Sequence, residues 1–330
     1  MNDRHTSAGD LALRDLRRFK PTCREPHDFD AFWCKQLEEA RASTNTPATV
    51  TEASTPLRTI RSWSVSFPGF GGQPIAAWLH APTGSDRPLP CIVEYSGYGQ
   101  GRGLVHERTL YAQAGYAHLV IDARGQNGAA ERCDTPDLGP WAVDTPSVLT
   151  RGLARPEEMY LTRLIIDAAR AVDAARTFEM VDSRRVAVAG ISQGGGLAII
   201  TAGLVADVAA VCADVPFLCH IWRGVALSTT GPYTEIRAHL AMRPELTDVA
   251  RATLSYVDAL HFAQRANAPA LFSVAGQDCV CPPSTVFAVY NHYAGPKDIR
   301  VWPFNAHEGG GGLQTATRID FLRETLDVVT

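Results

Sequence analysis

The stretch Gly190-Ile191-Ser192-Gln193-Gly194 matches the pattern G-x-S-x-G and is the most informative part of this sequence. The apolar run 185–189 precedes it and resembles a strand, whereas the run 197–200 after two further glycines can continue as a buried helix. A serine on such a strand-to-helix turn sits at a strained backbone position, and small neighbours let the helix pass close to the strand. The sequence therefore predicts that Ser192 is a catalytic nucleophile on such a turn, which is called a nucleophile elbow.

A serine nucleophile needs a base, and that base needs an acid to orient it. In elbow hydrolases the acid and the histidine follow the serine in that order, on loops after later strands. Asp278 follows the apolar run 270–275, and His307 follows the run 299–304. The intervening lengths accommodate a strand with a helical insertion, and then one helix and one strand. We therefore predict that Ser192, Asp278 and His307 form a catalytic triad.

Other histidines and carboxylates fit this order less well. Asp298 precedes its predicted strand, and Asp320 comes after His307. Asp214 also ends a predicted strand, 208–213, and is the alternative to Asp278; it comes one strand too early and leads into Val215-Pro216-Phe217, which suits packing. Four histidines lie in predicted helices or loops, and none of them follows a strand after the serine: His106, His239, His261 and His292.

Near-continuous apolar runs recur along the chain and are typical of parallel strands buried on both faces. Helical stretches separate most of them, as crossovers in an α/β sheet require. The runs 58–67 and 73–80 can pair antiparallel across the turn 68–72. This pattern predicts an α/β-hydrolase fold: a mostly parallel sheet of about eight strands with helices on both faces. The apolar runs are 90–95, 117–121, 185–189, 208–213, 270–275 and 299–304.

We expect residues 1–330 to form a single domain with three additions to this core. Residues 1–57 are predicted as an N-terminal helical extension, with two helices over 10–41. Residues 128–156 are rich in Pro, Gly and Asp and are predicted as a long loop, of the kind that is usually functional or forms an interface. Residues 217–265 are mostly helical in pattern and are predicted as a cap-like insertion over the active site.

Composition and charge argue against several classes of protein. The net charge is −4 and no basic run occurs, which disfavours nucleic acid or an anionic membrane surface as a partner. No stretch approaches the length of an uninterrupted membrane-spanning helix. The polar N-terminus lacks the features of a secretory signal, and the eight cysteines are scattered, several within apolar runs. These features predict a cytoplasmic protein.

The sequence offers little support for a metal or a cofactor. Cys279 and Cys281 are too closely spaced for an ordinary disulfide or a zinc site, and no C-x-x-C pair occurs. The pair His307-Glu308 lacks the second histidine of an H-E-x-x-H motif. We therefore expect neither a metal nor a cofactor.

Acyl transfer at the predicted triad would put negative charge on the carbonyl oxygen of the substrate, and two N–H donors must stabilise that oxyanion. The elbow supplies the N–H of Gln193, and the loop 96–99 after the strand 91–95 is the expected source of the other. The same loop suggests a dinucleotide-binding alternative, because Gly97-x-Gly99 follows a strand and Asp122 ends the next one. That fingerprint fails at its third glycine, where Arg102 stands.

Several stretches of the chain together match one known family. They are the elbow, Arg124-Gly125-Gln126 and His307-Glu308, with further stretches at 26–33, 214–220, 281–287 and 293–297. On these residues nearly the whole chain resembles carbohydrate esterase family seven, which contains acetyl xylan esterases and cephalosporin-C deacetylases.

The resemblance implies hydrolysis of acetyl esters on short xylo-oligosaccharides and on small molecules such as cephalosporin C. It implies the same triad and oxyanion donors at the backbone amides of Tyr95 and Gln193. It also implies structural roles for Arg124 and Gln126. The loop 128–156 resembles an insertion that helps to build a homo-oligomeric ring, commonly a hexamer, whose active sites face an inner cavity.

The sequence departs from the family pattern beside the predicted acid. Ala275-Gly276-Gln277 replaces the usual glycine-leucine-methionine, and Cys279 replaces a residue that is usually polar or β-branched. These changes alter the surroundings of Asp278 but retain the carboxylate. They bear on acyl-group preference and oxidation sensitivity more than on the reaction itself.

Overall fold

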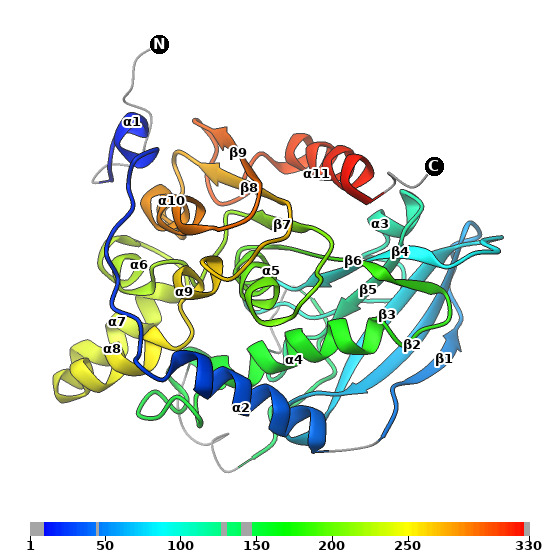
Figure 1. The fold of residues 1–330 in the computed structure, drawn as a ribbon, viewed down its shortest axis with the longest axis horizontal. Coiled ribbons are helices and arrows are strands. Elements are labelled where there is room, and N and C mark those ends of the chain that lie inside the picture. The colour runs from blue at the N-terminus through cyan, green and yellow to red at the C-terminus, as the bar shows by residue number, and fades with distance from the viewer. Residues whose placement is uncertain (1–9, 44–45, 127–130, 140–146, 327–330) are drawn as a thin grey trace.

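The computed structural model describes residues 10–43, 46–126, 131–139 and 147–326. Within them one sheet contains nine strands in the order β1-β2-β3-β5-β4-β6-β7-β8-β9 (Figure 1). The first four strands in this order pair antiparallel, and the pairs from β5 to β9 are parallel. The strands are β1 (Thr49–Ala53), β2 (Ile60–Pro68), β3 (Pro74–Pro82), β4 (Leu89–Tyr95), β5 (Ala117–Ile121), β6 (Val181–Ile191), β7 (Val211–Asp214), β8 (Ala270–Ala275) and β9 (Lys297–Trp302).

Helices cover both faces of the sheet, as the α/β-hydrolase prediction requires. Short helix α3 (Leu110–Gln113) and α11 (Gly311–Leu326) lie on one face (Figure 1), where Tyr111, Leu322 and Leu326 belong to a buried apolar cluster. The larger cluster lies on the other face, beneath α2 (Phe29–Ala42), α4 (Tyr160–Ala175), α5 (Gln193–Leu204) and α10 (Pro283–His292). Both clusters draw residues from central strands, whose apolar side chains are buried on both sides.

Successive residues of β6 show why the central strands read as uninterrupted apolar runs. Val186 and Val188 belong to the larger cluster, whereas Ala187 and Ala189 belong to the smaller one. Because side chains alternate between the two faces, a strand covered on both sides needs apolar residues at every position. This arrangement confirms the predicted parallel core.

Strand β1 corrects the prediction of a purely helical segment 1–57 and accounts for the ninth strand. The two predicted helices are present as α1 (Leu13–Leu16) and α2, but Thr49–Ala53 pairs with β2 at the sheet edge. Thr49 to Glu52 are exposed, so the strand has no buried face and no apolar alternation to reveal it. Residues 1–9 lie outside the described part of the chain.

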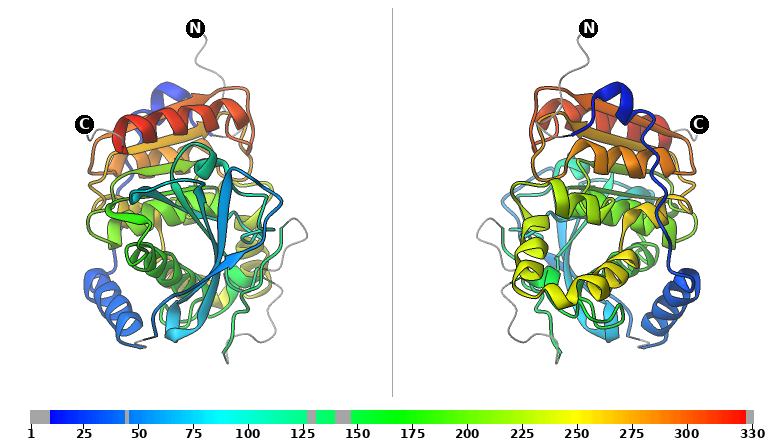
Figure 2. Two further views of the ribbon diagram at one scale, coloured as in Figure 1. Left: turned by 90° about the vertical axis from the view of Figure 1, so that its right-hand side faces the viewer. Right: turned by 90° about the vertical axis from the view of Figure 1, so that its left-hand side faces the viewer.

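The segment 217–265 is helical, as its pattern predicted. It contains α6 (Ile221–Leu227), α7 (Pro232–Met242), α8 (Thr247–Ser255), α9 (Ala259–Ala263) and a short 3-10 helix at Pro244–Leu246. These helices gather on the left of Figure 1, the side that faces the viewer in the right-hand view of Figure 2.

The long loop predicted over 128–156 is described only in part, because 128–130 and 140–146 lie outside the described residues. The rest of it forms irregular backbone apart from a 3-10 helix at Val148–Thr150. Among the described helices, none combines the length and the apolar character needed to cross a bilayer.

Candidate active site

Ser192 lies at the turn between β6 and α5, with backbone angles φ 57° and ψ −118°. A positive φ is uncommon outside glycine, so this residue is held in a strained conformation, as predicted for an elbow. Two hydrogen bonds fix it: the Ser192 N–H donates to the carbonyl of Asp214 at 2.9 Å, and the Phe217 N–H donates to the carbonyl of Ser192 at 2.8 Å. The last residue of β7 and the segment that follows it therefore hold the strained turn in place.

The glycines beside the turn are required by close backbone contacts. A Cβ atom at Gly190 would lie 2.3 Å from the carbonyl carbon of Gly194, and a Cβ at Gly194 would lie 2.1 Å from the carbonyl oxygen of Tyr95. Side-chain atoms cannot approach backbone so closely. The start of α5 thus packs directly against both its own strand and the end of β4.

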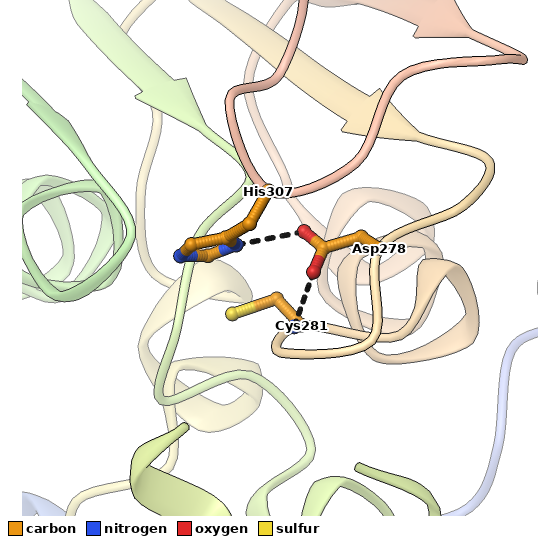
Figure 3. Close-up of side chains that lie close together, drawn as sticks. All are labelled: Asp278, Cys281 and His307. Carbon is orange, nitrogen blue, oxygen red and sulfur yellow. Dashed lines mark hydrogen bonds and ion pairs between the residues drawn. The ribbon is translucent and has the colours of Figure 1, made fainter. Parts of the chain in front are cut away.

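Three side chains distant in sequence form a hydrogen-bonded chain at the carboxyl ends of the parallel strands. Nε2 of His307 lies 2.9 Å from Oγ of Ser192, and its Nδ1 lies 2.9 Å from Oδ2 of Asp278. Figure 3 shows the imidazole directed toward the carboxylate, which comes from the loop after β8. The other carboxylate oxygen accepts the N–H groups of Val280 and Cys281 at 2.8 and 2.9 Å. The fully buried Asp278 is thereby fixed against the imidazole.

The carboxylate of Asp214, the alternative acid, contacts residues of α11 and not His307. Its Oδ1 accepts a hydrogen bond from Gln314 at 2.8 Å, and its Oδ2 lies 3.2 Å from Nε of Arg318. Burial raises the pKa of Asp214, although Arg318 and Gln314 oppose that shift. The structure therefore brings Asp278, and not Asp214, to His307.

The two residues proposed as oxyanion donors lie beside the serine. Gln193 is the first residue of α5, so its N–H has no acceptor within the helix. Tyr95 is the last residue of β4, and both Tyr95 and Ser192 line the same cavity. Their backbone positions are compatible with the role that the family resemblance implied for both residues; reasoning from the residues alone gave Gln193 and the loop 96–99 instead of Tyr95.

Comparison with known proteins identifies the family. The model of the acetyl xylan esterase family (AXE1) matches residues 7–325. The chain belongs to this family. Its structure resembles an acetyl xylan esterase from Paenibacillus sp. R4, with a TM-score of 0.89 and 36% identity over 96% of this chain and 100% of that one. It also resembles acetyl xylan esterase 1 from Thermoanaerobacterium sp. JW/SL YS485, with a TM-score of 0.86 and 30% identity over 96% and 99% of the two chains.

A further relative is longer than this chain. Acetyl esterase Axe7A of Xylanibacter ruminicola is 28% identical over 295 residues, which cover 87% of this chain. This chain spans 65% of the length of that relative.

Arg124 and Gln126, marked by the family resemblance, hold together the segments around the elbow, and Gln126 contacts the elbow itself. The Arg124 guanidinium donates to both carboxylate oxygens of Asp167, and both side chains are fully buried. The Gln126 amide donates to Oε1 of Gln193 at 2.7 Å, and its own oxygen accepts the Gly99 N–H at 2.6 Å. The Gln126 bonds link the loop after β4 to the start of α5, whereas the Arg124 bonds tie the loop after β5 to α4.

Asp122 organises a loop, contrary to its place in the dinucleotide-binding alternative. Its carboxylate accepts the backbone N–H groups of Arg102 and Asp134, both at 2.8 Å, and the Thr135 hydroxyl at 2.9 Å. The Asp122 carboxylate is therefore occupied by its own loop and is not placed to bind a ribose. The third glycine of the dinucleotide-binding fingerprint is also missing.

Asp278, Cys281 and His307 place potential metal-ligand atoms within 4.8 Å of one another (Figure 3). Burial and the nearby Asp278 raise the pKa of the Cys281 thiol well above its ordinary value, which disfavours the thiolate that a metal ligand requires. Asp278 and His307 already use the relevant atoms on each other. The donor set therefore favours the hydrogen-bonded chain over a metal centre.

The serine opens onto a cavity of about 470 Å³ that the sequence did not define. Gly231 and Pro232 bring the segment 217–265 into its wall, and Tyr98 donates from its hydroxyl to Glu235 of α7 at 2.7 Å. No local motif links these positions, because the fold brings them together from different connections.

The same cavity has a charged wall, which consists of Glu94, Arg108 and Glu131. Burial alone would raise the pKa of Glu94, but a 2.8 Å hydrogen bond to His118 and the Arg108 guanidinium lower that pKa to about 2. Glu94 is therefore ionised at neutral pH. Sequence reasoning missed this wall, since its three residues come from a strand and two separate loops.

Proposed function

We propose that this protein is a serine esterase that removes acetyl groups from small acetylated carbohydrates through an acetyl-enzyme intermediate. The observation that carries the proposal is the position of His307, whose ring nitrogens lie 2.9 Å from the Ser192 hydroxyl and 2.9 Å from the Asp278 carboxylate. Membership of the acetyl xylan esterase family supports the choice of an acetyl ester.

In the proposed reaction, His307 accepts the Ser192 hydroxyl proton while Oγ attacks the acetyl carbonyl carbon. The tetrahedral intermediate collapses, and the alcohol leaves with the proton from His307. Asp278 holds the tautomer with a proton on Nδ1 and stabilises the imidazolium. His307 then activates a water molecule that hydrolyses the acetyl-enzyme and regenerates Ser192.

The backbone N–H groups of Tyr95 and Gln193 are the proposed oxyanion donors. Both belong to rigid elements, at the end of β4 and the start of α5, so they need no reorganisation as charge develops. The loss of one such donor costs about 3 kcal/mol of transition-state stabilisation.

We infer that the substrates are short acetylated xylo-oligosaccharides or molecules of similar size. A cavity of about 470 Å³ is in the range that holds a small ligand. By resemblance to its family, the protein also acts on cephalosporin C-type acetyl esters. No cofactor or metal takes part in the proposed steps.

The decisive experiment is an acetate-release panel of acetylated xylose, cephalosporin C and polymeric acetyl-xylan, run on the wild type and Ser192→Ala. The proposal predicts release from the small substrates that disappears in the variant. Equal turnover of acetyl, butyryl and hexanoyl p-nitrophenyl esters would instead indicate a broader acyl esterase. A serine that phenylmethylsulfonyl fluoride does not label would indicate a non-catalytic binding protein.

Assembly and location follow as further proposals. By resemblance, the protein forms a homo-oligomeric ring, with a hexamer favoured, which sedimentation analysis tests directly. The described residues include eight cysteines without disulfides, among them the exposed Cys34 and Cys279, and this supports a reducing compartment such as the cytoplasm. We propose neither nucleic acid nor a membrane as a partner.

A further inference from the structure

The charged wall of the active-site cavity, defined above as Glu94, Arg108 and Glu131, shares that cavity with Ser192 and His307. An alcohol held in the cavity while its acetyl group reacts at Ser192 therefore lies close to these charged side chains. Neither the family match nor the elbow chemistry assigns a role to these three side chains. Their geometry bears on which leaving groups the enzyme accepts.

Arg108 is committed to the two carboxylates on either side of it. Its Nη2 lies 2.7 Å from Oε2 of Glu131, and its Nη1 lies 3.5 Å from Oε1 of Glu94. Nη2 also donates to the Gln100 side chain at 3.2 Å. The guanidinium thus serves as an internal counter-ion and holds the cluster in one arrangement.

The three side chains are withdrawn from bulk solvent without being sealed off. Their exposed fractions are 16% for Glu94, 16% for Arg108 and 24% for Glu131. Charges in such a position are screened less than those on the open surface. A ligand in the cavity therefore interacts with these charges more strongly than a ligand on the open surface would.

The wall carries two negative charges and one positive charge, so it has a net charge of about −1. The nearby Arg318 pairs with Asp214, and His118 hydrogen-bonds to Glu94 from behind the wall. Among the described residues that line the cavity, Arg108 is the only lysine or arginine. An anionic leaving group would consequently find no uncommitted cation to bind.

The wall still offers hydrogen bonds to a neutral ligand. A carboxylate has acceptor sites on both oxygens, and Glu131 uses only Oε2 among the described contacts. Sugar hydroxyls can donate to such oxygens. Burying a hydroxyl without a partner is costly, so matched acceptors favour hydroxyl-rich alcohols.

We propose that Glu94, Arg108 and Glu131 form a leaving-group subsite that accepts neutral, polyhydroxylated alcohols and disfavours those with a carboxylate. This inference rests on the proposed esterase function and makes its substrate class narrower. It predicts a higher kcat/KM for neutral acetylated sugars than for anionic acetyl esters. Cephalosporin C, a substrate that the family resemblance implies, is one of these anionic esters.

The test compares a mono-acetylated methyl xyloside with a mono-acetylated methyl glucuronide, whose additional ring substituent is a carboxylate. Assays run at about pH 8, where an ordinary imidazole is neutral. We expect the wild type to favour the xyloside at least tenfold in kcat/KM, mainly through KM. Glu131→Gln removes one negative charge with little change in shape and should improve the glucuronide about fivefold to tenfold relative to the xyloside.

Glu52→Gln is the matched control, because Glu52 is an exposed residue of β1 paired with Arg61. It changes the net charge equally and should leave the substrate ratio unaltered. A second measurement needs no variant: raising the ionic strength should lower the wild-type KM for the glucuronide and leave that for the xyloside unchanged.

Equal wild-type kcat/KM values, an unchanged ratio in Glu131→Gln, or a glucuronide KM insensitive to salt would overturn the subsite. Turnover of p-nitrophenyl acetate separates this failure from failure of the proposed function. An enzyme that hydrolyses p-nitrophenyl acetate but has equal kcat/KM for the xyloside and the glucuronide retains the proposed esterase function and lacks the subsite. A protein that hydrolyses none of these substrates is not the proposed esterase.

Discussion

Oδ2 of Asp278 lies 2.9 Å from Nδ1 of His307, although the two residues belong to loops after different strands. The carboxylate is fully buried, and its other oxygen accepts two backbone N–H groups from its own loop. These bonds leave the acid little freedom to turn away from the imidazole. In the proposed mechanism, this rigidity selects the tautomer that leaves Nε2 free to accept the Ser192 proton.

Replacement of the acid should separate it from its alternative. Asp278→Asn is expected to lower kcat for p-nitrophenyl acetate by about 10⁴-fold, because an amide can favour the wrong imidazole tautomer while preserving the shape. Asp214→Asn is the matched control, since Asp214 pairs with Arg318 rather than with His307. It should lose stability but keep kcat within a few fold. A larger loss of kcat in Asp214→Asn than in Asp278→Asn would show that Asp278 is not the catalytic acid.

The elbow glycines provide a steric prediction. Gly194→Ala would place Cβ 2.1 Å from the carbonyl oxygen of Tyr95, and we expect it to cost more than about 3 kcal/mol of stability or to prevent folding. Gly312→Ala introduces the same methyl group in helix α11, where nothing lies within 4 Å. It should stay within about 1 kcal/mol of the wild type. Chemical denaturation measures both; equal stabilities would contradict the close packing described for α5 and β4.

The charged wall predicts a particular dependence of stability on pH. The pKa of Glu94 is lowered to about 2 from 4.5 by His118, Arg108 and Arg318, against the effect of burial. The folded state therefore binds this proton less tightly than the unfolded state does. The resulting stabilisation is present above about pH 4.5 and is lost as the pH falls toward about 2, by up to about 3 kcal/mol.

Glu94→Gln has no such proton to bind. Its free energy of unfolding should fall less steeply than that of the wild type between about pH 4.5 and the acid limit of folding. Urea denaturation followed by tryptophan fluorescence at several pH values measures the two slopes. Parallel slopes would show that Glu94 is not stabilised in its ionised form.

Local sequence patterns predicted the parts of the fold that depend on local physics. The glycine-flanked Ser192 requires one kind of turn, and strands buried on both faces require unbroken apolar runs, so both were recognisable. Asp278 and His307 followed from the order of strands, because loops after parallel strands meet at one edge of the sheet.

The features that escaped prediction depend on long-range contacts or on exposed positions. Strand β1 is exposed at a sheet edge and therefore lacks an apolar pattern. Polar residues at 182–184 hid the first part of β6, which begins at Val181. The charged wall joins Glu94 in a strand to Arg108 and Glu131 in loops, and no spacing rule connects a strand residue to residues in two later loops.

The central claim is that Ser192 carries the acetyl group between the two half-reactions. Its most direct test is acid quenching of the enzyme during turnover of p-nitrophenyl acetate, followed by peptide mass spectrometry. The proposal predicts one added acetyl group on the peptide that contains Ser192, and neither this adduct nor turnover in Ser192→Ala. Undiminished turnover in Ser192→Ala, or an acetyl group that transfers to water from another residue, would contradict it.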